Sequence, residues 1–371
     1  MEKLRNQEEQ PKKNHSLSTI EYGTQAFDLE EMPSVTEKMV EEFKDYFSNK
    51  NYSEIDPVKI SSGVDKSVRF IGSHVSPMKP YFLNDDIPEN GLMMSQPCLR
   101  TRNQAKLFDD TYIPKWGSYF ESMGVLVKPE QKQKLFYESL DYLLNTVKIP
   151  PEKLVLRINN NDEDLYEMVQ EFKDKIDIEE NAMPEKYYQH KIGVNGVSGR
   201  NFNYSLKTEN GLSDIGNFIY LENEKEGLGV ELALGTSTIL KEYLNLEHVN
   251  SANPVVPIEK IDSEFKYKFE DTIITSVTLL SEGLRPGGKE NKSRILRSYI
   301  RGIIYFKNKL ELSINDVLGF IKNYENSQKI NNEASEFLKD YLQIEELEIQ
   351  TKTELSSEEK EVYSSINKNN L

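Results

Sequence analysis

The chain has few of the residues on which disulfide-rich and metal-binding proteins depend. It holds one cysteine, Cys98, among 371 residues, which excludes a disulfide framework and a zinc site built from cysteines. Its four histidines, His15, His74, His190 and His248, are scattered and show no metal-ligand spacing. An apolar run of about 18 residues and the pattern of a signal peptide are both missing. We therefore expect no membrane-spanning part and a reducing compartment, the cytoplasm.

The sequence has fewer basic than acidic side chains. The sequence has 46 Lys and Arg residues against 62 Asp and Glu residues, so its formal net charge is −16. This charge disfavours general binding to nucleic acid, and we expect no DNA partner, although a local basic patch can still bind RNA. The hydrophobic fraction of 37% is enough to form a core, and the length predicts one large domain with a smaller one.

Composition and periodicity divide the chain into four parts. Residues 1–32 carry 7 acidic and 4 basic side chains and are expected to form a flexible segment. Residues 33–256 show helical and strand-like patterns that predict an α+β domain. Residues 257–348 predict a helical domain, and residues 349–371 predict an acidic, flexible tail.

Several local patterns can be checked against a structure. Pro33 begins an apolar stripe typical of a helix, and a second helix of about 17 residues begins near Pro129. Asp164 is expected to cap a further helix, and either Thr236 or Ser237 is expected to cap another. The glycine-rich stretch 192–204 is expected to form a loop.

The most informative stretch is Leu92–Gly124. Two strand-like runs, 95–101 and 118–123, are joined by a polar loop of mixed charge, and the first run ends in Arg100. Guanidinium groups bind phosphate oxygens through two aligned donors, so an arginine beside a loop suits a triphosphate. The alternative is an ordinary hairpin with exposed arginines. On the second run, alternation places Glu121 on one face together with Tyr119 and Met123.

Two later strands carry polar residues where an apolar side chain is usual. Asn217 lies in the predicted strand 214–220, and a buried amide needs a hydrogen-bonding partner. In the run 229–235, Glu231 shares one face with Ala233 and Gly235, while larger aliphatic residues take the other face. A small face with one carboxylate is what a pocket for an ammonium group requires.

The segment 285–309 is the one strongly basic part of the sequence. It holds 8 basic residues and one acidic residue, Glu290. Its apolar residues form a helical stripe, so the arginines can project towards an RNA backbone. The alternative is a solvated helix face that pairs with the acidic tail. The candidate RNA-binding residues are Lys289, Asn291, Lys292, Arg294, Arg297 and Arg301.

The order of these motifs resembles a class II aminoacyl-tRNA synthetase, in particular alanyl-tRNA synthetase. The runs 95–100 and 119–124 resemble motif 2 of that family, and the resemblance spans roughly residues 36–310. Residues 230–238 resemble motif 3, with Glu231 at the acidic position and Gly235 at its second glycine. Thr238 stands where motif 3 has an arginine, and in another register Leu232 stands there. The resemblance ends before the family's editing and oligomerisation domains, and it implies an antiparallel sheet flanked by helices, followed by a helical domain.

This resemblance implies roles for individual residues. It assigns Arg100 and Glu121 to catalysis, and Asn217 and Glu231 to amino-acid binding. It implies ATP and Mg²⁺ as cofactors, a small amino acid such as alanine as substrate, and a tRNA acceptor stem or a carrier protein as the acceptor. The alternative is a non-catalytic paralogue that binds tRNA or a protein. The residues implied for the nucleotide are Arg100, His190, Ile215, Gly216, Asn217 and Gly235.

Overall fold

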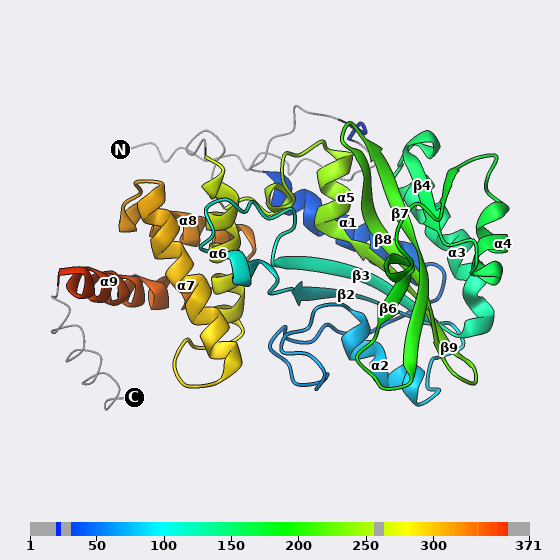
Figure 1. The fold of residues 1–371 in the computed structure, drawn as a ribbon, viewed down its shortest axis with the longest axis horizontal. Coiled ribbons are helices and arrows are strands. Elements are labelled where there is room, and N and C mark those ends of the chain that lie inside the picture. The colour runs from blue at the N-terminus through cyan, green and yellow to red at the C-terminus, as the bar shows by residue number, and fades with distance from the viewer. Residues whose placement is uncertain (1–19, 24–30, 256–262, 332, 355–371) are drawn as a thin grey trace, which may run out of the picture.

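The computed structural model describes residues 20–23, 31–255, 263–331 and 333–354 (Figure 1). Most of the segment predicted to be flexible at residues 1–32 lies outside these residues, and so does the predicted domain boundary between residues 256 and 257. At the other end, the last helix continues to Glu354, beyond the predicted start of the tail at residue 349.

A nine-stranded sheet forms the centre of the first domain. Its strand order is β1-β2-β3-β9-β8-β7-β4-β5, and β6 pairs with β7 beside this path. The pairings from β2 to β4 are antiparallel, whereas β1 with β2 and β4 with β5 are parallel. The strands are β1 (Ser53–Glu54), β2 (Leu92–Leu99), β3 (Tyr119–Val127), β4 (Leu154–Ile158), β5 (Asp177–Glu180), β6 (Gln189–Lys191), β7 (Val197–Thr208), β8 (Gly211–Asn223) and β9 (Gly227–Gly235).

One face of the sheet packs against the helices that contribute most to the core. These are α1 (Met32–Ser48), α3 (Lys132–Asp141) and α5 (Thr236–Tyr243), with α4 (Glu163–Gln170) towards the edge strands. The predicted stripe on α1 is confirmed, since its apolar residues Met39, Phe43 and Phe47 have no exposed surface. Val230, Leu232 and Leu234 of β9 point into the same core, as their alternation requires.

The opposite face of the sheet carries α2 (Val75–Leu83). Figure 1 shows α2 on one side of β2 and β3, with α1 and α5 on the other. Met78 and Phe82 of this helix pack with Met94 and Leu126 in a smaller apolar cluster. The face is therefore only partly apolar, and its polar residues lie at the centre of the sheet.

A helical region follows the sheet, as predicted. It consists of α6 (Phe265–Ser281), α7 (Asn291–Lys309), α8 (Ile314–Ser327) and α9 (Glu333–Glu354), which share a second core. Leu107, from the loop between β2 and β3, is buried in this core, and Tyr119 packs against it. The α+β prediction, a largely antiparallel sheet with flanking helices followed by a helical region, is thus confirmed.

The helical run predicted near Pro129 is confirmed, and it consists of a 3₁₀ turn, the α-helix α3 and a π-type turn at Tyr142–Thr146. Other local predictions were wrong. α4 begins directly after Asp162, so Asp164 lies inside it, and Gly235 occupies the N-cap of α5 with no capping side chain. The glycine-rich stretch is a loop only as far as residue 196, because β7 begins at Val197. No helix among the described residues is long and apolar enough to cross a membrane.

The aromatic core beneath the sheet yields a stability prediction. Phe43 is fully buried and contacts the rings of Phe47 and Tyr142. We expect Phe43→Ala to lower the free energy of unfolding by about 3–5 kcal/mol, because it leaves a cavity. Urea denaturation followed by circular dichroism measures this loss. Phe108→Ala is the control, since Phe108 is 46% exposed; an equal loss in both variants would contradict the assignment.

Candidate ligand-binding site

The strand register gathers polar residues on the α2 face of the sheet. Gly124 of β3 lies opposite Ala233 of β9, which lies opposite Asn217 of β8, which in turn lies opposite Asn203 of β7. Glu231 lies two residues along β9 from Ala233 and therefore on the same face. The predicted side for Glu231, Ala233 and Gly235 is thus the side opposite the main core.

Arg100 lies at the end of β2, beside this face. Its backbone N–H donates to the Ser118 carbonyl at 2.9 Å, which continues the pairing between β2 and β3. Its Nε donates to the carbonyl oxygen of Gly72 at 3.1 Å, and its guanidinium carbon lies 4.7 Å from the centre of the Phe120 ring. Among the described residues, its two terminal nitrogens have no hydrogen-bond partner, and the residue is exposed. The guanidinium is therefore oriented and still available to an anion.

Glu231 has a neighbour that the sequence analysis did not predict. His74, at the start of α2, places its Nε2 3.0 Å from Oε1 of Glu231, and its Nδ1 lies 2.8 Å from the Ser122 hydroxyl. His74 has no exposed surface, and Glu231 is 1% exposed. The imidazole lies flat against Gly124, where an added Cβ would be 1.9 Å from Cδ2 of the ring. The second carboxylate oxygen of Glu231, Oε2, is buried and has no hydrogen-bond partner among the described residues.

Asn217 and His190 belong to one chain of hydrogen bonds. Asn217 donates through Nδ2 to Oδ1 of Asn203, and Asn201 donates to the same oxygen at 3.3 Å. Oδ1 of Asn201 lies 2.9 Å from Nδ1 of His190. Asn201 and Asn203 are both buried, so this chain fixes the side-chain amides that a ligand on this face would meet. The sequence analysis missed both residues because it read the start of β7 as a loop.

Two of the residues implied for a nucleotide lie away from this face. Ile215 is buried in the main core. An added Cβ at Gly216 would lie 2.5 Å from the Ala233 carbonyl and from a methyl of Leu234, so Gly216 serves the packing of β8 against β9. At Gly235 the nearest atom to an added Cβ would be the Thr238 hydroxyl at 2.6 Å.

Glu121 is separated from Arg100 by the sheet. It shares the face of Met123, which is buried in the main core, as the alternation predicted. Its Oε1 accepts a 2.6 Å hydrogen bond from the Ser95 hydroxyl. Burial raises the pKa of its carboxyl, and the Ser95 hydrogen bond opposes part of that rise. The structure therefore does not bring Glu121 to the face where Arg100 and Glu231 lie.

Comparison with known proteins supports the resemblance read from the motifs. The alanine–tRNA ligase of Caldicellulosiruptor saccharolyticus is 24% identical over 135 residues, which cover 36% of this chain and 15% of the ligase. That of Natranaerobius thermophilus is 26% identical over 129 residues, covering 34% of this chain and 14% of the ligase. The chain is thus similar to alanine–tRNA ligases over about a third of its length, and the matched part is a small fraction of theirs.

Other comparisons are weaker. No protein-family model matches the chain. Among solved structures, aspartyl-tRNA synthetase from Entamoeba histolytica has a TM-score of 0.34 at 11% identity and covers 59% of this chain and 58% of its own. Asparaginyl-tRNA synthetase from Pyrococcus horikoshii has a TM-score of 0.36 at 10% identity and covers 61% of this chain and 67% of its own. Both scores are low.

A buried carboxylate connects the loop between β2 and β3 to the helical region. Asp271 of α6 accepts hydrogen bonds from the backbone N–H and the hydroxyl of Ser118, each at 2.6 Å, and from the Asn103 amide at 3.2 Å. Ser118 in turn holds the backbone of Arg100 through its carbonyl. Burial raises the pKa of the Asp271 carboxyl. Asp271 therefore positions the strand end from which Arg100 projects, a role visible in the sequence only as an acid inside an apolar helix.

The candidate RNA-binding residues fall into two groups. Lys289, Asn291 and Arg294 are exposed around the start of α7. The other three have partners within the chain. Lys292 donates to the Ser61 carbonyl, Arg297 donates to the Pro286 and Gly288 carbonyls, and Arg301 lies 3.2 Å from the carboxylate of Glu345. Arg301 thus pairs with α9 at a residue that precedes the predicted acidic tail, 349–371, with which the alternative interpretation expected pairing.

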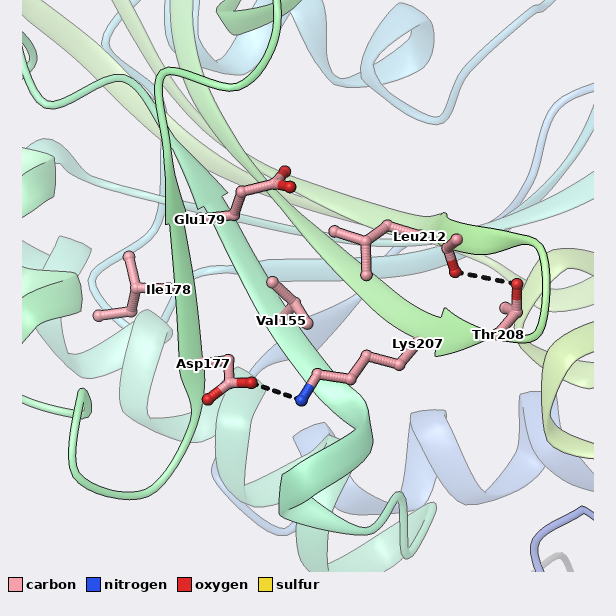
Figure 2. A pocket seen from close by; sticks show the side chains of 8 residues that line it. Val155, Asp177, Ile178, Glu179, Lys207, Thr208 and Leu212 are labelled. Atoms are coloured by element: carbon pink, nitrogen blue, oxygen red, sulfur yellow. Dashed lines mark hydrogen bonds and ion pairs between the residues drawn. The ribbon is translucent and has the colours of Figure 1, made fainter.

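An open hollow elsewhere on the sheet contains none of the predicted residues. It lies where β4 and β5 meet the β7–β8 hairpin, and Figure 2 shows Lys207 and Asp177 joined across it. The ion pair joins β7 to β5, and the Thr208 hydroxyl donates to the Gly211 carbonyl within the turn between β7 and β8. The residues lining it are Val155, Asp177, Ile178, Glu179, Lys207, Thr208, Gly211 and Leu212.

The environment of Glu121 predicts how stability depends on pH. Its folded-state pKa is raised, so folding favours the neutral carboxyl more than the unfolded chain does. Its contribution to stability is therefore complete below its unfolded pKa, about 4.3, and is lost as the pH rises through the folded value. We expect Glu121→Gln to melt at the same temperature as wild type at low pH and at a higher temperature at pH 8.

Thermal melts across the pH range measure this difference. Glu152→Gln is the matched control, because Glu152 is exposed and should show no such trend. A Glu121→Gln variant that is less stable than wild type at pH 8 would contradict the prediction.

Proposed function

We propose that the protein is a synthetase-like ligase that uses ATP to activate a small amino acid, with alanine favoured, and transfers it to tRNA or to a carrier protein. The observation that supports this most directly is Arg100, an oriented and exposed guanidinium beside a face that carries Glu231 and Asn217. The similarity to alanine–tRNA ligases covers part of the chain and points to the same chemistry. In this proposal the protein acts in the cytoplasm.

In the proposed reaction, a carboxylate oxygen of the amino acid attacks the α-phosphorus of ATP. The new oxygen–phosphorus bond forms as the bond to pyrophosphate breaks, which gives an aminoacyl-adenylate. Arg100 would donate its two terminal N–H groups to the phosphate oxygens, on which negative charge grows in the transition state. The acceptor's hydroxyl or thiol then attacks the activated carbonyl carbon, loses its proton, and AMP leaves.

The remaining residues would hold the amino acid. Glu231 would face its ammonium group, and Asn217 would donate to its carboxylate or to the ribose. Ala233 and Gly124 flank Glu231 and favour a small side chain. Mg²⁺ would arrive with the triphosphate and neutralise its charge; among the described residues, no group of three or more His, Cys, Asp or Glu side chains is placed to hold a metal ion.

A second candidate function rests on the contact between His74 and Glu231. Because the carboxylate is already close to an imidazole, the chain can also be a non-catalytic synthetase paralogue that binds tRNA or a protein. Thr238, at the position of the motif 3 arginine, favours the same alternative. The two functions differ in whether the protein forms an adenylate.

Exchange of labelled pyrophosphate into ATP measures adenylate formation. With alanine, glycine or serine present, we expect exchange by wild type and a loss of about 100-fold or more in Arg100→Ala, as for one preorganised donor to a developing charge. Arg69→Ala is the control, because Arg69 is an exposed arginine outside the proposed site. No exchange by wild type with any of the twenty amino acids would favour the non-catalytic paralogue.

The exposed basic residues predict how RNA binds. We expect wild type to bind an RNA hairpin with an affinity that falls steeply with salt, because phosphate contacts release counterions. Replacing Lys289 and Arg294 with Ala should weaken binding equally for all hairpin sequences and reduce the salt slope by about 2, one for each phosphate contact. Filter binding at several salt concentrations measures both.

The control for that experiment is Lys339→Ala, an exposed lysine on α9. Absence of RNA binding by wild type at about 50 mM salt would move the carrier protein ahead of tRNA as the acceptor.

A further inference from the structure

One short segment contacts both ends of the proposed site. Residues 71–74 lead from an irregular stretch into α2, and Ile71 is held by the backbone of Ile60 and of Leu99. From this segment the carbonyl oxygen of Gly72 accepts the 3.1 Å hydrogen bond of Arg100 Nε. Two residues later, Nε2 of His74 lies 3.0 Å from Glu231. The segment thus spans the distance between the arginine and the carboxylate.

The contact at Glu231 occupies the position expected for a bound ammonium group. An α-amino acid presents its ammonium group to a carboxylate, and the proposed function assigns that carboxylate to Glu231. Here Nε2 of the imidazole lies in its place, 3.0 Å from Oε1. Because His74 has no exposed surface and Glu231 is 1% exposed, an external ammonium group cannot contact Glu231 while the ring is in place.

The Glu231 carboxylate is also incompletely satisfied. A buried carboxylate usually accepts hydrogen bonds at both oxygens, since an unpartnered buried polar atom costs free energy. Oε2 of Glu231 has no partner among the described residues, although the side chain is buried. An ammonium group, with three donors, can serve both oxygens of this carboxylate.

We propose that His74 occupies the ammonium position of the amino-acid subsite and sets the affinity of this subsite by competing with the ammonium group for Glu231. This inference rests on the proposed function, because it takes the ligand of Glu231 to be a small α-amino acid. This position of His74 requires glycine at residue 124, since only a residue without a Cβ leaves room for the ring.

The direct test is amino-acid binding by isothermal titration calorimetry, with glycine, L-alanine and L-serine as ligands. We expect His74→Ala to bind at least one of them tenfold or more tightly than wild type, because the competing ring is gone. Free imidazole should compete with the amino acid in this variant. His248→Ala is the matched control: His248 is also buried, but it bonds to the Pro114 carbonyl and should show wild-type affinity.

A second variant displaces the ring without removing it. A Cβ at residue 124 would overlap the imidazole, so Gly124→Ala should force His74 out of the pocket and lower the melting temperature. In the His74→Ala background, the same change should lower the melting temperature much less, because the space is empty. This comparison shows whether the imidazole ring lies against residue 124, even if neither protein binds an amino acid.

The outcomes separate this inference from the proposed function. Equal amino-acid affinity in folded wild type and folded His74→Ala, or no binding by either, would overturn the inference. If His74→Ala binds more tightly and neither protein exchanges pyrophosphate, the inference stands and the proposed ligase activity fails. If wild type exchanges pyrophosphate and its affinity equals that of His74→Ala, the activity stands and the inference fails.

Discussion

A carboxylate placed inside a sheet must meet a donor, and this requirement organises the α2 face of the protein. Glu231 lies on the central strand β9 with almost no exposed surface, so its charge depends on His74 for a partner. That contact in turn requires the position of α2, which begins at His74, and the absence of a side chain at Gly124. The position of α2, the position of the imidazole ring and the small residues on this face of β9 therefore depend on one another.

A second buried carboxylate joins the sheet to the helical region. Asp271 belongs to the helical region, yet its oxygens accept from Ser118 and Asn103 in the hairpin loop. Ser118 also bonds to the Tyr299 hydroxyl of α7, so the end of β3 is held by two helices at once. Any ligand that shifts these helices would move the strand end that carries Arg100. The helical region therefore helps to position the candidate site.

The predictions that succeeded rest on alternation and on helical periodicity. Phe43 of α1 is in the core and Glu231 faces away from it, because both patterns depend only on neighbours along the chain. The predictions that failed concern the ends of helices. Asp164 lies inside its helix, since the first residue of a helix cannot be read from local sequence alone. The close packing of Gly216 against β9 was likewise not visible in the sequence, because it depends on the neighbouring strand. Glu121 was placed on the correct face of its strand, but the sequence does not say which face meets α2.

The sequence by itself determined the α+β class, the polar residues at the centre of the strands and the resemblance to alanine–tRNA ligases, because these depend on residue type and order. Only the tertiary structure decided what those polar residues contact. His74 is 157 positions from Glu231, and Asp271 is 153 positions from Ser118. Contacts over such separations follow from strand order and helix placement, and each of these is set by packing across the whole domain. For this reason a histidine that looked isolated in the sequence lies against the carboxylate that was expected to bind the substrate.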